Sequence, residues 1–254
     1  MPADLKTLHV TAEGPILNIQ LNRPDTGNSI DGQMLTELLE VLRAMEDDPA
    51  IRVMVLSGAG NDFCKGADRS EFSTLLEIDT SGSGLRALND RAQRVCSTLS
   101  QLGVVTIARL HGAVLGAGLG LAIFCDLRVG ADTCRFRMPE VGLGLPPAWG
   151  GALPRLAEEA GQAQVRELLL TAESFNAARA KQLSILHKVA SVGDLDAAVA
   201  RWVKPIVRRN PATMRITKSM LNARARAAEL SVGGYLDAAL SSAAMHAEPP
   251  TCSA

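Results

Sequence analysis

The residues best placed to do chemistry in this chain are a glutamate and the glycine-rich turn that precedes it. Glu140 ends the segment 137–140 (RMPE), twenty positions after the last glycine of the segment 116–120 (GAGLG), since 140 − 120 = 20. Glycines let backbone N–H groups approach a ligand without a Cβ in the way, and a helix that starts there exposes further N–H donors. A carbonyl oxygen held on these donors would have its α-proton near Glu140. The pair therefore predicts a site for proton transfer beside a carbonyl, such as that of an acyl thioester.

Alternating strand and helix patterns surround these two motifs. Segments 9–12 and 16–21 flank a Gly-Pro turn and predict a hairpin. Further strands are expected at 53–56, 104–110, 127–129 and 134–136, and helices from Asp31 through Leu42, over 85–102 and from the glycine-rich turn to Cys125. Strands that alternate with helices favour an α/β unit with parallel pairing.

The last quarter of the chain has helical patterns only, over 195–208, 211–228 and 232–244. This change predicts a core at 1–194 that carries the site and a helical C-terminal subdomain at 195–254. Helices rich in Ala and Leu need a surface to pack on, and subunit assembly is one candidate.

Composition narrows the class of protein. Among 254 residues 47% are hydrophobic and 21% are charged, which is typical of a folded globular chain. The net charge of −1 gives no electrostatic footprint for nucleic acid or acidic membrane. The five cysteines share no metal-ligand spacing and indicate reduced thiols. With neither a signal-peptide pattern nor an apolar run long enough to span a membrane, we expect a soluble cytoplasmic protein with no bound metal.

Three segments, taken in order, resemble the crotonase superfamily, the enoyl-CoA hydratases and isomerases. They are 55–68 (VLSGAGNDFCKGAD), 109–122 (RLHGAVLGAGLGLA) running into 125–128 (CDLR), and 136–146 (FRMPEVGLGLP). Weaker matches are 21–24 (LNRP), 171–177 (TAESFNA) and 210–212 (NPA) with Thr217 and Lys218. The resemblance covers roughly residues 10 to 225. It implies a crotonase-like α/β spiral of ββα units, with a C-terminal helical subdomain that mediates trimers or dimers of trimers.

The resemblance also implies a substrate and roles for particular residues. The substrate is an acyl-CoA thioester, so coenzyme A enters with it and no separate cofactor is expected. The oxyanion hole falls on the backbone N–H groups of Ala67 and Ala117, and the acid–base on Glu140. Alanine at 117, where many relatives have glycine, keeps the N–H provided that φ is negative. The positions implied to contact substrate or CoA are Arg23, Lys65, Gly66, Asp68, Arg69, Ser70, Gly116 and Gly118. For Arg23 and Lys65 an ordinary solvated charge remains an equal alternative.

One departure from the family pattern bears on the reaction. Hydratases of the family use two glutamates, and the first of these falls on Gly120, which has no side chain to hold water. A single carboxylate is enough to move a proton from C2 to C4, so the sequence favours a double-bond isomerase. The run 141–157 has no carboxylate, which disfavours the dienoyl-CoA isomerases. Hydration of a 2-enoyl-CoA, another thioester reaction, or acyl-CoA binding without catalysis remain alternatives.

Several other residues could be taken for functional ones, but we expect them to have structural roles. We expect Asp68 to cap the following helix, Asp126 to be structural, His111 to lie in a turn, and Cys64 and Cys125 to be inert core thiols. Ser184 stands where relatives have glycine, so it should adopt a left-handed backbone. The segment 116–120 also approaches a dinucleotide fingerprint, but its third glycine falls one place early and Glu140 follows a proline.

Overall fold

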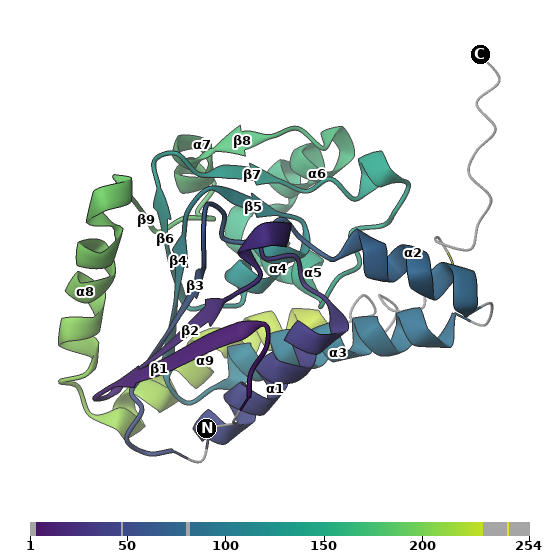
Figure 1. Cartoon of the computed structure of the whole chain (residues 1–254). Helices are drawn as coiled ribbons and strands as arrows, with labels where there is room; N and C mark the ends of the chain where they lie inside the picture. Colours follow the sequence, from purple (N-terminus) through teal and green to yellow (C-terminus); the bar gives the residue numbers. More distant parts are fainter. Residues whose placement is uncertain (1–3, 47, 80–81, 231–242, 244–254) are drawn as a thin grey trace.

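The computed structural model of the chain describes residues 4–46, 48–79, 82–230 and 243. Its largest sheet has six strands in the order β1-β2-β3-β4-β6-β9 (Figure 1). Their bounds are β1 Leu8–Glu13, β2 Ile16–Leu21, β3 Val53–Gly58, β4 Val105–Leu110, β6 Leu127–Ala131 and β9 Lys188–Ala190. Strands β1 and β2 form an antiparallel hairpin, and every later neighbour in this sheet pairs in parallel. The hairpin and the parallel α/β unit expected from the sequence are confirmed.

A smaller sheet stands beyond the ends of the large one. It consists of β5 (Ala113–Leu115), β7 (Arg135–Arg137) and β8 (Phe175–Asn176), in that order. Strand β5 pairs in parallel with β7, and β7 is antiparallel to β8. Because β5 leads into the glycine-rich turn and β7 leads into Glu140, this pairing brings the two predicted motifs together.

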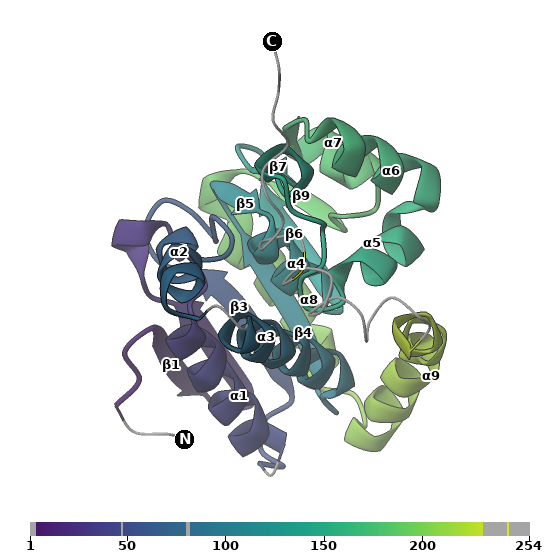
Figure 2. The same cartoon turned by 90° about the vertical axis from the view of Figure 1, so that its right-hand side faces the viewer.

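Helices cover both faces of the six-stranded sheet. Helices α1 and α3 lie on one side and α8 lies on the other, while α5, α6 and α7 gather near the smaller sheet (Figures 1 and 2). The bounds are α1 Gly32–Glu46, α2 Arg69–Ile78, α3 Ser83–Gln101, α4 Ala117–Ile123, α5 Ala152–Ala160, α6 Gln162–Thr171, α7 Ala177–Gln182, α8 Leu195–Ile206 and α9 Pro211–Leu230. Three short 3-10 turns lie at Pro24–Thr26, Val141–Leu143 and Val192–Asp194.

The first helix shows how local sequence sets the ends and the buried face. The Asp31 carboxylate accepts a hydrogen bond from the Met34 N–H at 2.8 Å, which satisfies one of the donors that the first turn leaves free. The apolar residues at 35, 38, 39 and 42 are all buried, as the 3-4 spacing predicts. Helix α3 faces α1 through residues of the same spacing, among them Leu88, Val95 and Leu99.

The C-terminal helices described here pack on the core of the same chain. Helix α8 contacts β4 and β6, and α9 contacts α5 and β4. Lys218 of α9 is 7% exposed and donates to the Val104 carbonyl at 2.8 Å while pairing with Asp126 at 2.8 Å. The helix predicted at 232–244 lies outside the described residues.

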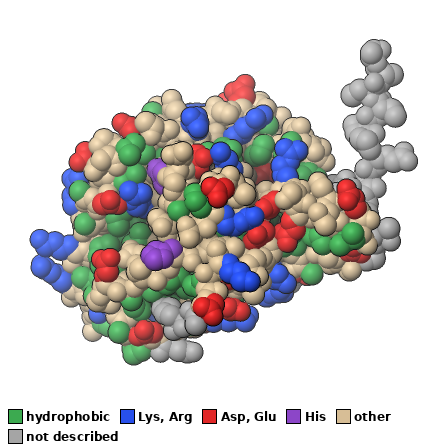
Figure 3. Space-filling model, in the orientation of Figure 1, with side chains coloured by type: hydrophobic (Ala, Val, Ile, Leu, Met, Phe, Trp, Pro, Cys, Tyr) green, Lys and Arg blue, Asp and Glu red, His purple; other side chains and the backbone are tan. Residues whose placement is uncertain are grey.

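The surface and the thiols agree with the composition. On the face shown in Figure 3, acidic and basic side chains lie interspersed. Cysteines 64, 96, 125 and 134 are buried, and burial raises the pKa of the thiols of Cys64, Cys125 and Cys134 to about 12. This agrees with the inert core thiols predicted at 64 and 125. None of the helices within the described ranges is long and apolar enough to cross a membrane.

Candidate active site

The two predicted halves of the oxyanion hole are joined through the backbone. A parallel bridge links Cys64 to Val114, in which the Cys64 N–H donates to Ala113 and the Leu115 N–H donates to Cys64. A Cβ added to Gly66 would lie 3.1 Å from the Leu115 carbonyl oxygen and 3.7 Å from the Ala117 nitrogen. Gly66 has φ +103°, a conformation that glycine adopts without strain. The segment that carries Ala67 therefore passes directly beside the start of α4.

Backbone geometry leaves the N–H groups of Ala67 and Ala117 facing away from their neighbours. Ala67 forms a parallel bridge with Ile30, which uses the Gly66 carbonyl and the Asp68 N–H at 2.8 Å each, so the N–H of Ala67 itself points to the other side. Ala117 is the first residue of α4, where a helix provides no partner for the N–H. Its backbone is helical, which meets the condition of negative φ set by the sequence.

Glu140 lies against the glycine-rich turn. A Cβ added to Gly116 would come within 2.9 Å of the Glu140 Oε1, and the Gly116 N–H donates to the Arg137 carbonyl at 2.9 Å. Gly116 has φ +47°, so a side chain at this position would both strain the backbone and meet the carboxylate. The proton-transfer pair predicted from spacing is thus adjacent in the fold.

The Glu140 side chain is half-buried, and its carboxylate is incompletely bonded. Its Oε2 atom has no hydrogen-bond partner within the described residues. Burial raises the pKa of Glu140 above its usual value, and a hydrogen bond from its own backbone only partly opposes this shift. A carboxyl group with a raised pKa and a free oxygen is suited to accept and return a proton.

The position of the absent second glutamate is filled by an aromatic ring. A Cβ on Gly120 would lie 2.9 Å from Cε3 and 3.2 Å from Cζ3 of Trp149, and 3.3 Å from the Cβ of Ala152. The ring belongs to a loop that joins the 3-10 turn after Glu140 to helix α5. Sequence reasoning identified the missing acid but not Trp149, because nothing in the spacing relates the two positions.

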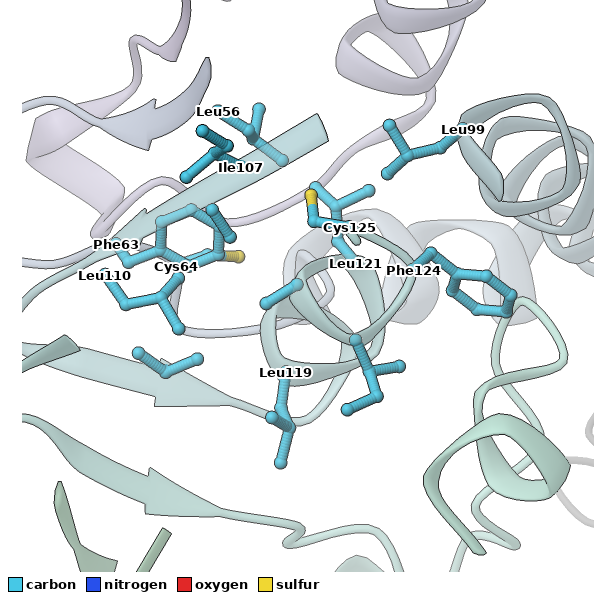
Figure 4. Packing of buried hydrophobic residues seen from close by; sticks show 14 of the residues in the cluster. Leu56, Phe63, Cys64, Leu99, Ile107, Leu110, Leu119, Leu121, Phe124 and Cys125 are labelled. Atoms are coloured by element: carbon cyan, nitrogen blue, oxygen red, sulfur yellow. The ribbon is translucent and has the colours of Figure 1, made fainter. Parts of the chain in front are cut away.

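Helix α4, which carries Ala117, is buried along its whole length and is bonded at its C-terminal end. All seven of its residues are buried, and Figure 4 shows Leu119 and Leu121 among side chains from neighbouring strands. At the far end the fully buried Arg128 donates to the carbonyls of Cys125 at 2.7 Å and Ile185 at 2.6 Å, and pairs with Glu159 at 2.6 Å. Burial lowers the pKa of the Arg128 guanidinium, and Glu159 opposes that shift.

Arg23 and Asp68 lie together on the other side of Ala67. The Arg23 guanidinium pairs with Asp68 at 2.9 Å and Asp31 at 3.2 Å, and donates to the Ser29 carbonyl at 2.6 Å. Asp68 caps α2 by accepting from the Ser70 N–H, as expected. Hydrogen bonds from Ser70 and Arg23 and the nearby guanidinium outweigh burial and hold the pKa of Asp68 below its usual value. This network fixes the strand segment on which Ala67 lies.

The remaining predicted positions differ in their surroundings. Lys65 is half-exposed and pairs with Asp62 at 3.0 Å. Gly118 packs closely on Cys64, whose Cβ would be 2.7 Å from a Cβ at 118. Arg69 and Ser70 occupy the first turn of α2. None of these contacts tests binding of coenzyme A, so those roles stay predictions.

The residues assigned to structure behave as expected. Asp126 accepts from the N–H and hydroxyl of Thr106 at 2.7 and 3.0 Å. The His111 Nε2 lies 2.9 Å from the Gly60 carbonyl, in the turn before Gly112. Ser184 has φ +61°, the left-handed conformation predicted for it.

A separate cavity of about 500 Å³ opens at the opposite edge of the sheet, where β4 and β6 begin. Its charged lining includes Asp126 with Lys218, and Arg155 with Glu159, each pair within 2.9 Å. These two carboxylates are ion-paired, unlike the Glu140 carboxylate, whose Oε2 has no hydrogen-bond partner in the part of the chain that the structure describes.

The predicted site brings the backbone at Ala67 and Ala117 and the Glu140 carboxylate close together, and comparison with known proteins identifies the family. The family model described as enoyl-CoA hydratase/isomerase matches residues 11–249. A crystal structure of an enoyl-CoA hydratase/isomerase from Marinobacter aquaeolei has a TM-score of 0.81 at 32% identity, covering 92% of this chain and 88% of that one. The chain belongs to the enoyl-CoA hydratase/isomerase family, and its α/β architecture is the crotonase fold.

Two relatives of the chain are named for different reactions. A short-chain-enoyl-CoA hydratase of Clostridium acetobutylicum is 29% identical over 86% of this chain and 82% of the relative. A peroxisomal Δ(3,5)-Δ(2,4)-dienoyl-CoA isomerase of Arabidopsis thaliana is 30% identical over 92% and 85% respectively. The protein is therefore an enzyme of a family whose members include both hydratases and isomerases.

Proposed function

We propose that this enzyme shifts the double bond of an enoyl-CoA by proton transfer through a single carboxylate. Glu140 removes a proton from C2 of a 3-enoyl thioester and returns it at C4. The N–H groups of Ala67 and Ala117 hold the carbonyl oxygen as it gains negative charge in the dienolate. Two such donors each contribute about 3–4 kcal/mol of transition-state stabilisation. The contact of Glu140 with Gly116, beside Ala117, is the observation that carries this proposal.

Coenzyme A binding is proposed for the residues around the entrance to this site. Lys65, half-exposed beside Asp62, and the start of α2 at Arg69 and Ser70 offer a cation and hydrogen-bond donors. The proton transfer uses no cofactor, because coenzyme A is part of the substrate. Replacing Lys65 by methionine should raise KM for the CoA ester and leave kcat within about twofold.

The deciding experiment follows the absorbance of the conjugated thioester when the protein meets a medium-chain 3-enoyl-CoA. A rise in wild type that is lost in Glu140→Gln supports isomerisation. Incubation in deuterated water adds a second readout, because deuterium in the product reports exchange of the Glu140 proton with solvent, whereas direct return of the abstracted proton leaves the product unlabelled. Turnover near the wild-type rate in Glu140→Gln would contradict the proposal.

Hydration of a 2-enoyl-CoA is the second candidate, since several relatives of this chain are named hydratases. It requires a group that holds and activates water. Trp149 fills the space beside Gly120 where a second carboxylate would stand. Loss of 2-enoyl absorbance on addition of the wild-type protein would favour this candidate over isomerisation.

We also propose that the enzyme forms trimers, or dimers of trimers, through the C-terminal helices. Helix α9 exposes Ile216, Met220 and Leu221, at 56%, 73% and 75% respectively. Three exposed aliphatic side chains on one helix are suited to contact between subunits. Light scattering on a size-exclusion column measures the mass directly, and a monomer would contradict this part of the proposal.

A further inference from the structure

Two glycines at the start of helix α4 are covered by the proposed catalytic carboxylate and by the ring of Trp149. Gly116 and Gly120 are four positions apart, and the Gly120 N–H donates to the Gly116 carbonyl at 2.9 Å. Gly116 is the N-cap of α4, so it lies about one helical turn from Gly120. Glu140 covers the first of these positions and Trp149 covers the second. A ligand whose α-carbon lies at Glu140 therefore meets the indole within the next few carbons of its chain.

The loop that carries Trp149 is held in place on both sides. Gly150 and Gly151 have φ +61° and +74°, so both adopt the left-handed conformation. A Cβ on Gly150 would lie 2.7 Å from the Cys96 Sγ, which shows that the loop is pressed against α3. The Trp149 carbonyl accepts from the Ala152 N–H at 3.0 Å as α5 begins, and the ring packs on the hydrophobic core. These contacts fix the position of Trp149 beside Gly120.

An aromatic ring and a hydrated carboxylate cannot share this space. A Cβ at 120 would already be closer to Cε3 than carbon atoms approach in folded proteins, and a longer side chain would require the ring to move. The indole has one polar group, and the atoms facing Gly120 are ring carbons, which neither bind nor activate water.

We propose that Trp149 is a specificity-determining residue. Its ring occupies the space that a nucleophilic water would need, and it restricts the site to hydrocarbon acyl groups. The inference rests on the proposed function, because it concerns the carbons next to those that Glu140 protonates. Protonation of the dienolate at C4 gives the 2-enoyl thioester. Because the ring keeps water from the β-carbon of this product, the product leaves the site without being hydrated.

Four variants test the inference: Gly120→Glu, Trp149→Ala, the double variant Gly120→Glu/Trp149→Ala, and its matched control Gly120→Gln/Trp149→Ala. Gly120→Glu alone should not hydrate a 2-enoyl-CoA faster than wild type, because the ring still occupies the space. The double variant should hydrate it about 100-fold or more faster than the glutamine control, the usual effect of a general base. Equal rates in Gly120→Glu and the double variant, or no gain over the glutamine control, would overturn the inference.

A second measurement remains informative if the double variant does not fold. Trp149→Ala alone should raise kcat/KM for acyl-CoAs branched at C4, relative to linear ones, by about tenfold or more. An unchanged ratio would overturn the inference. Isomerisation of the 3-enoyl-CoA, followed by the rise in absorbance, separates the two levels of the proposal. Its absence from wild type contradicts the proposed function, whereas isomerisation retained in a double variant that gains no hydration contradicts only the role of Trp149.

Discussion

The two sides of the proposed oxyanion hole are held by different kinds of interaction. Around Ala67 the backbone is fixed by charge, with Arg23 between Asp31 and Asp68. Around Ala117 it is fixed by close packing, in which glycines allow Cys64 and Glu140 to approach α4. The charged side, with Arg23, Asp31 and Asp68, is partly exposed to solvent and offers polar groups to the proposed nucleotide of coenzyme A. The packed side keeps a carboxylate partly dehydrated, which raises its pKa. In the proposed mechanism, the binding of charge and the movement of a proton therefore fall on different sides of the site.

The largest effect is expected at the carboxylate on the packed side. Glu140→Gln should lower kcat for the 3-enoyl-CoA by about 10³-fold, because general acid–base catalysis contributes 10²–10⁴-fold. CoA-ester affinity, measured by calorimetry, should change little. Because only the ionised carboxyl accepts a proton, wild-type activity should fall as pH decreases through the raised pKa, at a higher pH than for an exposed glutamate. A pH profile without this acidic limb would contradict the role of Glu140.

The next effect comes from a methyl group placed beside that carboxylate. Gly116→Ala puts a Cβ 2.9 Å from the Glu140 Oε1 and should lower kcat by about 10²-fold, the cost of displacing a reacting group by roughly 1 Å. Gly144→Ala is the matched control, since Gly144 also has positive φ but no atom lies within 4 Å of its Cβ position. Similar losses of kcat in both variants would show that backbone strain alone is responsible.

A smaller effect is expected on the charged side. Arg23→Met leaves Asp31 and Asp68 unneutralised and should lower the free energy of unfolding by about 1–2 kcal/mol, as urea denaturation would measure. Because the network holds Ala67, kcat should also fall, by about fivefold. If Arg23 serves only to bind phosphate, KM alone will rise and stability will be unchanged.

The smallest expected effect is a gain in stability from Glu140→Gln. The folded-state pKa of Glu140 is raised above the unfolded value, so ionised Glu140 destabilises the fold above that raised pKa, and this cost disappears below the unfolded pKa of about 4.5. The glutamine variant should therefore have a slightly higher free energy of unfolding than wild type at neutral pH, with the difference vanishing in acid. An advantage that is independent of pH would have another cause.

The sequence predicted those features that depend on neighbouring residues or on an ordered set of motifs. The hairpin, the Asp31 cap, the helix after the glycine-rich turn and the helical cap at Asp68 all depend on residues close in sequence, and each is confirmed. The contact between Gly116 and Glu140 followed from motif order. Small elements such as β8 and β9, two and three residues long, have no period long enough to recognise.

The surroundings of the site were harder to predict because they depend on tertiary contacts. Trp149 reaches Gly120 only because two left-handed glycines turn the loop back toward α4. Arg128 is fully buried although arginine is usually exposed, and its partners at 123, 125, 159 and 185 come from separate segments. The sequence shows such residues, but only the fold shows what they face.

The bridge between Cys64 and Val114 also has a consequence for how the activity arises during folding. The bridge joins residues that are 50 positions apart, since 114 − 64 = 50. The two proposed donors, Ala67 and Ala117, are also 50 positions apart, since 117 − 67 = 50. Closing a loop of this length costs chain entropy that local structure cannot offset. Pairing of β3 with β4 supplies the compensation, because it aligns the segments that follow each strand. The proposed oxyanion hole consequently forms only after β3 and β4 have paired, and recovery of turnover on refolding reports this long-range pairing rather than the formation of helices.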